Sequence, residues 1–358
     1  MHTQRCPVAN PTFKFLKNPE TCLESMAIVL KSPDAASKGL VLLAYSYFFP
    51  LFLHIFNVPA IQKDYHICLE PSWSGFFTRD ILSFTSLEEP VFVQAIEPRD
   101  ALFIERGTRN LIPVSIAANY WVDYRSFSPL RGSSTRGKDV DIVMVSSWAK
   151  FKRHALVFEA LKNIKRAGRE LKISLVGYPI DLTKDDIWHE AKSRGIENQI
   201  EMFENLSPSE VVTQYQRAKL NLLWSKKEGF NRSIIEGMFC NIPCILREGF
   251  NYGHKYHYIN RKTGQFVSEG NLETAIIHMV DNFDRFSPRE YVENTMTWER
   301  AVDILHKKIC AVTKRNGENF SGEIVGKINN LNGMSYWNPA DSIKFSKDYE
   351  HLMTHVKI

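Results

Sequence analysis

The chain has 358 residues, which is too long for one ordinary core and suits two domains of roughly 150 residues each. Hydrophobic residues make up 44% and charged residues 24% of the sequence, a composition typical of a folded globular protein that excludes a long disordered chain. The net charge of +5 comes from dispersed Lys and Arg residues without a nucleic-acid motif, so we expect an anionic small substrate or an acidic lipid surface and no nucleic-acid partner.

The first 37 residues are polar and rich in proline, with one helix-like run from residue 20 to 30, and we expect them to form an arm or cap. They carry no apolar stretch behind the initial positive charge, so no signal peptide is predicted. The six cysteines show neither a CxxC pair nor zinc-like spacing. They are expected to be free, mostly buried thiols of a cytoplasmic protein, with peripheral contact at the inner face of the membrane as an option.

The most apolar segment, residues 40 to 56, is about as long as a minimal membrane span. It contains Pro50, a serine and a histidine, which favour a buried strand followed by a helix that begins at Pro50. An alternative hypothesis uses the residues from Phe48 to Phe56 as the docking surface of a membrane-associated assembly factor.

From residue 38 to 125, short apolar runs alternate with polar or helical connections. This rhythm is typical of a parallel sheet in an α/β layer, so we expect a Rossmann-like N-terminal lobe on the acceptor side. The expected strands are VLLAYSY, YHICLE, PVFVQAI and LIPVSIAA.

Ser, Gly, Pro and charged residues are concentrated from residue 126 to 139, which is the predicted linker. Beyond it, near-continuously apolar strands alternate with helices and indicate a doubly wound parallel sheet in a second lobe, residues 140 to 310. Residues 311 to 358 are predicted to pack back on the lobes. The fold class is therefore α/β, with two Rossmann-like lobes facing across a cleft. The expected strands of the second lobe are DIVMVSS, KISLVGY, QIEMFEN, LNLLWS and PCILRE.

One strand-loop-helix junction carries most of the predicted chemistry. It consists of strand LNLLWS, loop KKEGFNR and helix SIIEGMFC. In open parallel sheets, ligands bind at the carboxyl ends of the strands, where helix N-termini present free N–H groups and partial positive charge. Glu228 and Glu236 would bracket the N–H groups of residues 231 to 233, an arrangement that can hold a diphosphate and accept hydrogen bonds from hydroxyls.

This junction resembles the hallmark of the retaining GT-B enzymes of glycosyltransferase family 4, a Glu, seven residues and a second Glu within E-G-F-G-x-x-x-x-E-A-M-A-x-G-x-P. Here the pattern stands as EGFNRSIIEGMFCNIP, from Glu228 to Pro243. Further landmarks are VSSWAKFKRH, which places Lys152 on the family's phosphate-contacting lysine, LVGYP, IEMFENL and WSKKE. The resemblance covers about residues 108 to 305.

The resemblance implies a sugar transfer from a nucleotide-diphosphate sugar to a hydroxyl, with retention of configuration. Glu236 would bind the ribose, Lys152 the diphosphate, and Glu228 would face the transferred sugar as the catalytic carboxylate. The implied donor-binding residues are Ser147, Lys152, Gly177, Phe203, Ser225, Gly229, Phe230, Asn231, Arg232, Ser233 and Glu236.

Two departures from the family pattern bear on the donor. Ser147 stands where the family usually has Arg, and Arg232 could supply the missing cation. Asn231 replaces the usual Gly, so a side chain stands where the backbone approaches the sugar. A helix N-terminus with Lys152 and Arg232 can stabilise a leaving diphosphate, so we expect no cofactor and no metal; the Asp139-Val-Asp141 run begins a strand.

The acceptor, a glycan, a lipid-linked saccharide or a small molecule, is expected at the N-terminal lobe. Glu97 follows one predicted strand and is the candidate catalytic base, and Glu70 is the last residue of another and is the second option. Both acids also suit a purely structural role, as do the acids of the donor motif, since acids are favoured at helix starts.

Other side chains suit mainly structural roles. A loop from Tyr252 to Tyr258, rich in Tyr and His, could stack on a sugar or a base, although an ordinary aromatic loop is the commoner outcome. His154 is expected to start a helix, and Trp148 and Trp224 to be core or wall aromatics. The departures at Ser147 and Asn231 also leave open a non-catalytic module that binds nucleotide sugars or glycans.

Overall fold

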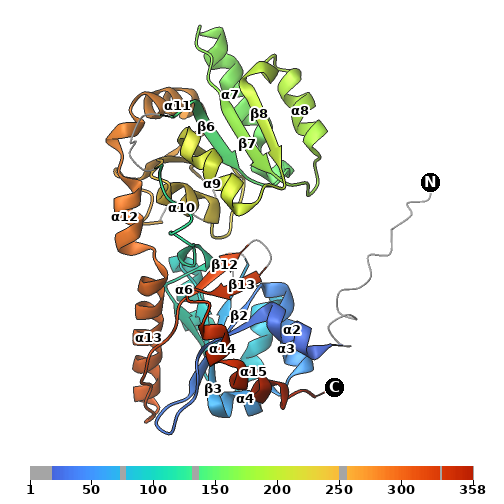
Figure 1. Cartoon of the computed structure of the whole chain (residues 1–358), viewed down its shortest axis with the longest axis vertical. Helices are drawn as coiled ribbons and strands as arrows, with labels where there is room; N and C mark the ends of the chain where they lie inside the picture. Colours follow the sequence, from blue (N-terminus) through green and yellow to red (C-terminus); the bar gives the residue numbers. More distant parts are fainter. Residues whose placement is uncertain (1–17, 73–77, 131–136, 250–255, 331–332, 358) are drawn as a thin grey trace, which may run out of the picture. The chain divides into compact units, whose positions relative to one another are not determined.

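The computed structural model describes residues 18–72, 78–130, 137–249, 256–330 and 333–357. The chain forms two compact units. Unit 1 combines the chain up to Trp121 with the segment from Trp298 onward, and unit 2 comprises Val122–Thr297. Each unit contains its own main sheet, coloured from blue to teal in unit 1 and from green to brown in unit 2 (Figure 1).

The main sheet of unit 1 has its strands in the order of the sequence, β1-β2-β3-β4-β5. Strands β2 to β5 are parallel, and β1 pairs antiparallel with β2 at the edge. Nearly every residue of these strands is buried, as expected for a parallel sheet covered on both faces. The strands are β1 Ala27–Lys31, β2 Gly39–Ala44, β3 Tyr65–Glu70, β4 Val91–Gln94 and β5 Leu111–Val114. The helices between them are α3 Phe49–Ile55, α4 Val58–Asp64, α5 Arg79–Leu82 and α6 Pro98–Gly107.

Residues 18 to 37 belong to unit 1 and contribute the edge strand β1 to its sheet, which differs from the arm or cap that the sequence predicts. Helix α2 Pro19–Met26 starts at Asn18, whose Oδ1 accepts a hydrogen bond from the N–H of Thr21 (3.3 Å). The predicted helix to residue 30 ends early because the β-branched Ile28 and Val29 belong to β1, where both are buried. Residues 1 to 17 lie outside the described residues.

The apolar segment from residue 40 to 56 confirms the predicted strand and helix. Strand β2 is followed by α3, which has Pro50 in its first turn. The aromatic side chains of the segment from Phe48 to Phe56 are buried in unit 1, so they do not form the membrane-docking surface of the alternative hypothesis. None of the described helices combines the length and the apolar character needed to cross a membrane.

The sheet of unit 2 is parallel throughout and has the order β11-β10-β9-β6-β7-β8. The first strand, β6, lies between β7 and β9, so the chain winds outward in one direction and then in the other. This is the doubly wound order of a Rossmann fold, with its switch point at the carboxyl ends of β6 and β9. The strands are β6 Val140–Val145, β7 Ile173–Gly177, β8 Ile200–Glu204, β9 Ala218–Leu223, β10 Cys244–Arg247 and β11 Gly264–Val267.

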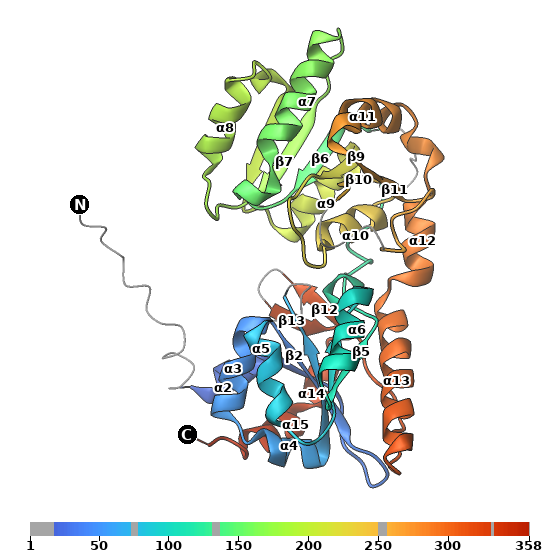
Figure 2. The same cartoon turned by 180° about the vertical axis from the view of Figure 1, so that it is seen from behind.

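Helices alternate with these strands as the sequence predicts. Helix α7 buries the stripe of Val157, Phe158, Leu161 and Ile164 against the sheet and contacts α8 and α11 (Figure 2). Trp148 and Trp224 are buried at strand ends, as expected. The helices are α7 His154–Arg166, α8 Lys184–Lys192, α9 Pro208–Arg217, α10 Arg232–Phe239, α11 Leu272–Asp281 and α12 Pro288–Thr295.

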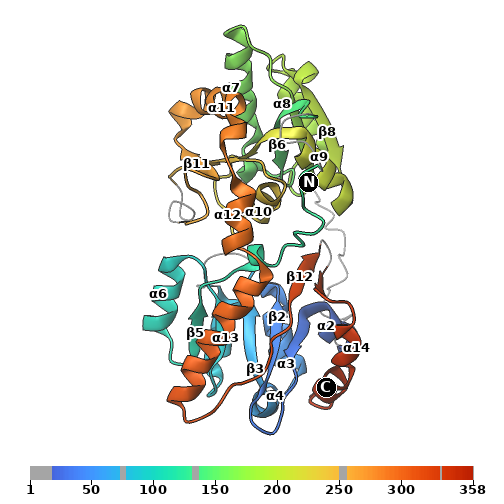
Figure 3. The same cartoon turned by 60° about the vertical axis from the view of Figure 1, so that its left-hand side comes forward.

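The chain returns to unit 1 at Trp298, earlier than the predicted end of the second lobe at residue 310. Helix α13 Trp298–Arg315 contacts β5, and the segment after it lies against the N-terminal half of unit 1 (Figure 3). The N–H of Val325, for example, donates to the carbonyl of Leu30 (2.9 Å). The first crossing, after Trp121, also precedes the predicted linker of residues 126 to 139. The remaining elements are β12 Lys327–Asn330, β13 Gly333–Tyr336, α14 Asp341–Lys344 and α15 Ser346–Met353.

Candidate active site

Two loops meet at the switch point of unit 2, one after β6 and one after β9. The N–H of Lys226 donates to the carbonyl of Phe151 (2.7 Å), which joins them directly. Glu228 is buried there: its Oε1 accepts a hydrogen bond from the Ser225 hydroxyl (2.5 Å) and forms an ion pair with the Lys152 ammonium group. The structure therefore brings together three residues of the predicted donor site that come from two separate landmarks, Lys152 from VSSWAKFKRH and the other two from WSKKE.

The second carboxylate of the motif lies one turn into α10. Glu236 is buried, and its Oε1 accepts from the Arg232 guanidinium (2.7 Å). Its Oε2 lies 3.3 Å from the hydroxyl of Tyr215, which also donates to the carbonyl of Ser233 (2.8 Å). Burial, followed by the charge of Glu236, raises the pKa of Tyr215 well above its usual value, so this hydroxyl stays protonated and can donate. Arg232, predicted as a phosphate-binding cation, thus forms an ion pair with the carboxylate predicted to bind the ribose.

Asn231 occupies the left-handed region, with φ 23° and ψ 56°, directly before α10. Its Oδ1 accepts from the hydroxyl of Tyr258 (2.8 Å) and does not cap the helix. Its Nδ2 is buried without a hydrogen-bond partner among the described residues. A buried amide with an unused donor, beside the open N–H groups of a helix start, is suited to a ligand with oxygen acceptors.

Two tyrosines, Tyr256 and Tyr258, contact the loop that contains Gly229 and Asn231. The hydroxyl of Tyr256 donates to the carbonyl of Gly229 (3.0 Å), and its ring stacks on that of Tyr258 with centroids 5.0 Å apart. Both rings are buried, so here they support the loop around Phe230, which is also buried. Of the predicted aromatic cluster, Tyr252 and His254 lie outside the described residues.

The remaining predicted donor residues lie in β7, in β8 and in the loop after β6. A Cβ on Gly177, at the end of β7, would clash with the carbonyl oxygen of Ser146, so only glycine fits between β6 and β7 at this point. Phe203 pairs with Val176 across β7 and β8. Ser147 is buried in the loop after β6.

His154 begins α7 as predicted and is buried beside the site, with its Nε2 3.3 Å from the Ser146 hydroxyl. Burial, and secondly the charge of Lys152, lowers the pKa of this imidazole from 6.5 to about 3. As the pH falls below 6.5, the unfolded chain therefore gains a proton that the folded chain does not bind, and the free energy of unfolding decreases by about 1.4 kcal/mol per pH unit.

We expect the free energy of unfolding, measured with urea, to be lower at pH 5 than at pH 7, and this loss to shrink in His154→Gln. Some pH dependence should remain, because burial also lowers the pKa of His66 in unit 1 to about 4. An equal loss in the variant and the parent would show that His154 is not the source.

The candidate acids of the acceptor side lie in unit 1. Glu97 precedes α6 and is buried, and its Oε2 has no hydrogen-bond partner among the described residues. Glu70 ends β3 and forms a buried ion pair with Lys327 (2.9 Å), while its Oε1 accepts from Asn329 (2.9 Å). Glu70 is therefore engaged in a structural contact with β12, in agreement with its structural interpretation.

The sequence does not reveal Tyr215, Asn221 or the supporting role of the Tyr256–Tyr258 pair. The Nδ2 of Asn221 donates to the carbonyl of Ser233 (2.9 Å), and a Cβ on Gly237 would lie 2.5 Å from that Nδ2. A signal was present for this contact, since Asn221 is the only uncharged polar residue of the β9 strand, AKLNLL. No such signal marks Tyr215 on the amphipathic α9.

Residues 130–283, which lie within unit 2, match the sequence profile of the family described as Glycosyl transferases group 1. The chain thus carries a glycosyl transferases group 1 domain. This match supports glycosyl transfer as the general activity. No curated protein sequence matches the chain.

Several solved structures share the fold of this chain. Sucrose-phosphate synthase from Thermosynechococcus elongatus is 15% identical, with a TM-score of 0.57 over 76% of this chain and 74% of the synthase. A glycosyltransferase from Rickettsia africae is 16% identical, with a TM-score of 0.55 over 72% and 73% of the two chains. A mutant of S. aureus TarM, in complex with fondaparinux, alpha-GlcNAc-glycerol and UDP, is 15% identical, with a TM-score of 0.53 over 69% of this chain and 51% of TarM. This chain therefore spans about half the length of TarM. The shared fold is GT-B, with two Rossmann-like lobes.

Proposed function

We propose that the protein transfers a sugar from a nucleotide-diphosphate donor bound in unit 2 to a hydroxyl acceptor, with retention of anomeric configuration and without a metal ion. The observation that carries this proposal is the Ser225–Glu228–Lys152 cluster at the switch point, in which the serine and the glutamate are buried, with Glu236 on the helix that starts beside it. The resemblance to retaining enzymes of glycosyltransferase family 4 supports the stereochemical part.

The donor diphosphate would bind at the start of α10. The first N–H groups of this helix have no partners within the helix, and its dipole places partial positive charge there. Lys152 adds a full positive charge from the loop after β6. Together these groups can stabilise the charge that develops on the leaving diphosphate.

The two carboxylates would serve different parts of the donor. Glu236, oriented by Arg232 and Tyr215, would accept hydrogen bonds from the ribose hydroxyls. Glu228 would face the transferred sugar, where a carboxylate stabilises positive charge developing at the anomeric carbon. Ser225 and Lys152 hold Glu228 in one orientation, which avoids reorganisation during the reaction.

The ion pairs of Asp139 and Asp141, which form the Asp-x-Asp run of the sequence, support metal independence. Asp139 pairs with Arg217 (2.7 Å), and Asp141 pairs with Lys219 (2.7 Å). The Arg217 hydrogen bond also lowers the pKa of Asp139. Both carboxylates are already neutralised by cations, so they are poor candidates for holding a divalent ion on a diphosphate.

The acceptor would be a glycan, a lipid-linked saccharide or a small molecule with a free hydroxyl. Glu97 is the proposed acceptor-side base because its carboxylate is buried with one oxygen unsatisfied among the described residues. Glu70 is less suited to this role because Lys327 and Asn329 already occupy its carboxylate.

A panel of nucleotide sugars tests the proposal in two stages. A thermal-shift screen identifies the donor, since a ligand that binds only the folded state raises the melting temperature. Turnover of that donor is then followed as released nucleotide diphosphate, with EDTA and with added Mg²⁺. We expect equal turnover in both solutions, whereas strict dependence on Mg²⁺ would overturn metal independence. Binding without transfer or hydrolysis, in any acceptor mixture, would identify a non-catalytic nucleotide-sugar module.

Asn231 is expected to tune donor choice. In Asn231→Gly the backbone keeps its left-handed conformation, but the side chain that faces the sugar position is lost. We expect transfer to persist while the ratio of kcat/KM for two donors that differ at one sugar hydroxyl changes by roughly 10-fold or more. Tyr258→Phe is the control, since it removes only the supporting hydroxyl. An unchanged ratio in Asn231→Gly would exclude this residue from donor selection.

A further inference from the structure

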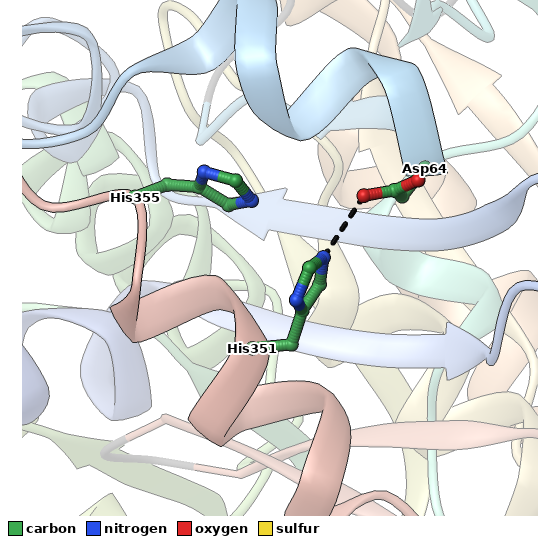
Figure 4. A group of neighbouring side chains, drawn as sticks. All are labelled: Asp64, His351 and His355. Carbon is green, nitrogen blue, oxygen red and sulfur yellow. Dashed lines mark hydrogen bonds and ion pairs between the residues drawn. The ribbon is translucent and has the colours of Figure 1, made fainter.

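Two histidines near the end of the chain lie against an aspartate of α4 in unit 1. Asp64 is the last residue of α4, His351 lies on α15, and His355 follows two residues after the end of that helix. Figure 4 shows both imidazole rings directed toward the space beside the Asp64 carboxylate. The three side chains thus come from two segments that are far apart in the sequence, His351 and Asp64 being separated by 287 positions.

The geometry of this group is close to that of a metal site. His351 Nε2 lies 2.9 Å from Asp64 Oδ2, and one ligand atom from each of the three residues lies within 4.8 Å of the others. The two imidazole rings are nearly perpendicular, with centroids 5.0 Å apart. Ligand atoms around a tetrahedral zinc ion, at bonds of about 2.0–2.2 Å, are separated by about 3.3–3.6 Å. Small rotations of the three side chains would bring their ligand atoms from separations within 4.8 Å to the separations found around zinc.

A second observation points to a missing ligand. The Nε2 atom of His355 is shielded from solvent and has no hydrogen-bond partner in the described part of the chain. A buried polar atom without a partner destabilises the folded state, and such atoms are rare in native proteins. The unsatisfied nitrogen belongs to the same group as the Asp64–His351 pair, so one bound cation would satisfy all three side chains.

We propose that Asp64, His351 and His355 bind a divalent transition metal of the zinc class. Two imidazoles and one carboxylate are ligands that zinc prefers, whereas magnesium and calcium require more oxygen ligands. Three protein ligands leave a fourth position for water. The side chains of Asp64 and His351 are 44% and 42% exposed, so the ion can enter from solvent.

The ion would fasten the C-terminal segment of unit 1 to the N-terminal part of the same unit. Backbone contacts already join these segments: the N–H of Asn57 donates to the carbonyl of His355 (2.8 Å), and the N–H of Lys357 donates to the carbonyl of Ile55 (2.8 Å). The metal would add side-chain bonds at the same place. This role is structural and departs from the sequence prediction of no metal; it concerns unit 1 and is independent of the donor residues of unit 2.

Calorimetric titration of the full-length, EDTA-treated and desalted protein with zinc sulfate tests the site. We expect one zinc ion per chain, a higher melting temperature with zinc, and affinity lowered at least 10-fold in His355→Ala and in Asp64→Asn. His54→Ala, which replaces an exposed histidine of α3 in the same unit, is the matched control and should bind as the parent does.

Cobalt provides a second readout that does not depend on stability. Co²⁺ bound to the parent should give the visible absorption of a four-coordinate ion, and His351→Ala should lose it. Zinc binding that is absent in the parent, or equal in the parent and in His355→Ala, would overturn the proposal. Nucleotide-sugar binding should be the same with and without zinc, so failure of the metal site and failure of the proposed function are distinguished.

Discussion

We expect the Glu228→Gln variant to lose sugar transfer while it keeps its fold and its affinity for the donor. The amide matches the carboxylate in size and can still accept from Ser225, but it has no charge for Lys152 or for positive charge at the anomeric carbon. Removing one preorganised electrostatic contact of this kind lowers kcat by roughly 10²–10³-fold. The measurement is kcat from released nucleotide diphosphate, together with donor affinity by calorimetry.

Glu190→Gln serves as the matched control for this substitution. Glu190 lies on α8 in the same unit, where it forms a partly exposed ion pair with Arg194 (2.6 Å). Its removal should leave kcat within about twofold, since exposed ion pairs contribute little. If Glu228→Gln transferred sugar as fast as the control, Glu228 would not be the catalytic carboxylate.

The largest loss of stability is expected for Glu70→Gln in unit 1. Glu70 and Lys327 form an almost fully buried pair, at 2% and 0% exposure, and the ammonium group also lies over the ring of Trp121 with 4.9 Å to the centroid. The amide leaves the Lys327 charge buried without its counterion. Breaking one side of a buried pair lowers the free energy of unfolding by about 3–5 kcal/mol, which urea unfolding would detect.

The double variant Glu70→Gln, Lys327→Met provides the test of this cause. Without either charge no unpaired ion is left buried, so the double variant should be more stable than Glu70→Gln alone. Additive losses would show that the two residues do not act as a pair.

The alternation of strands and helices in unit 2 could be predicted from the sequence because local patterns carry it. Near-continuous apolar strands are separated by helices with strong start signals, such as the capping box of Thr183 and Asp186 at α8. The N-terminal strand β1 could not be predicted, and the sequence pattern assigns its residues to an arm. Its five residues show no alternation of polar and apolar side chains, and its pairing with β2 is a tertiary contact. The boundaries at Trp121 and Trp298 likewise depend on which sheet each flanking segment packs against.

The donor site shows the same division. Glu228 and Glu236 could be found because a fixed spacing on one loop and helix is visible in the sequence. The residues that contact this motif from other elements could not, since Tyr215 approaches from α9 and Tyr258 from the loop before β11. Contacts of this kind depend on how elements pack, and no local spacing encodes them. The pairing of Asp64 with His351, which are 287 residues apart, is a further contact of this kind.

The two crossings between the units determine the order in which the chain can complete its folding. Because unit 2 lies between the two halves of unit 1 in the sequence, a chain growing from its N-terminus exposes β1 to β5 long before α13, β12 and α15 exist. Unit 2 is continuous in the sequence, so its sheet can form before the C-terminal part of unit 1 has been synthesised. Glu70 therefore has no counterion until Lys327 has been synthesised, and the contacts between the two halves of unit 1 can form only after the whole of unit 2 has been made.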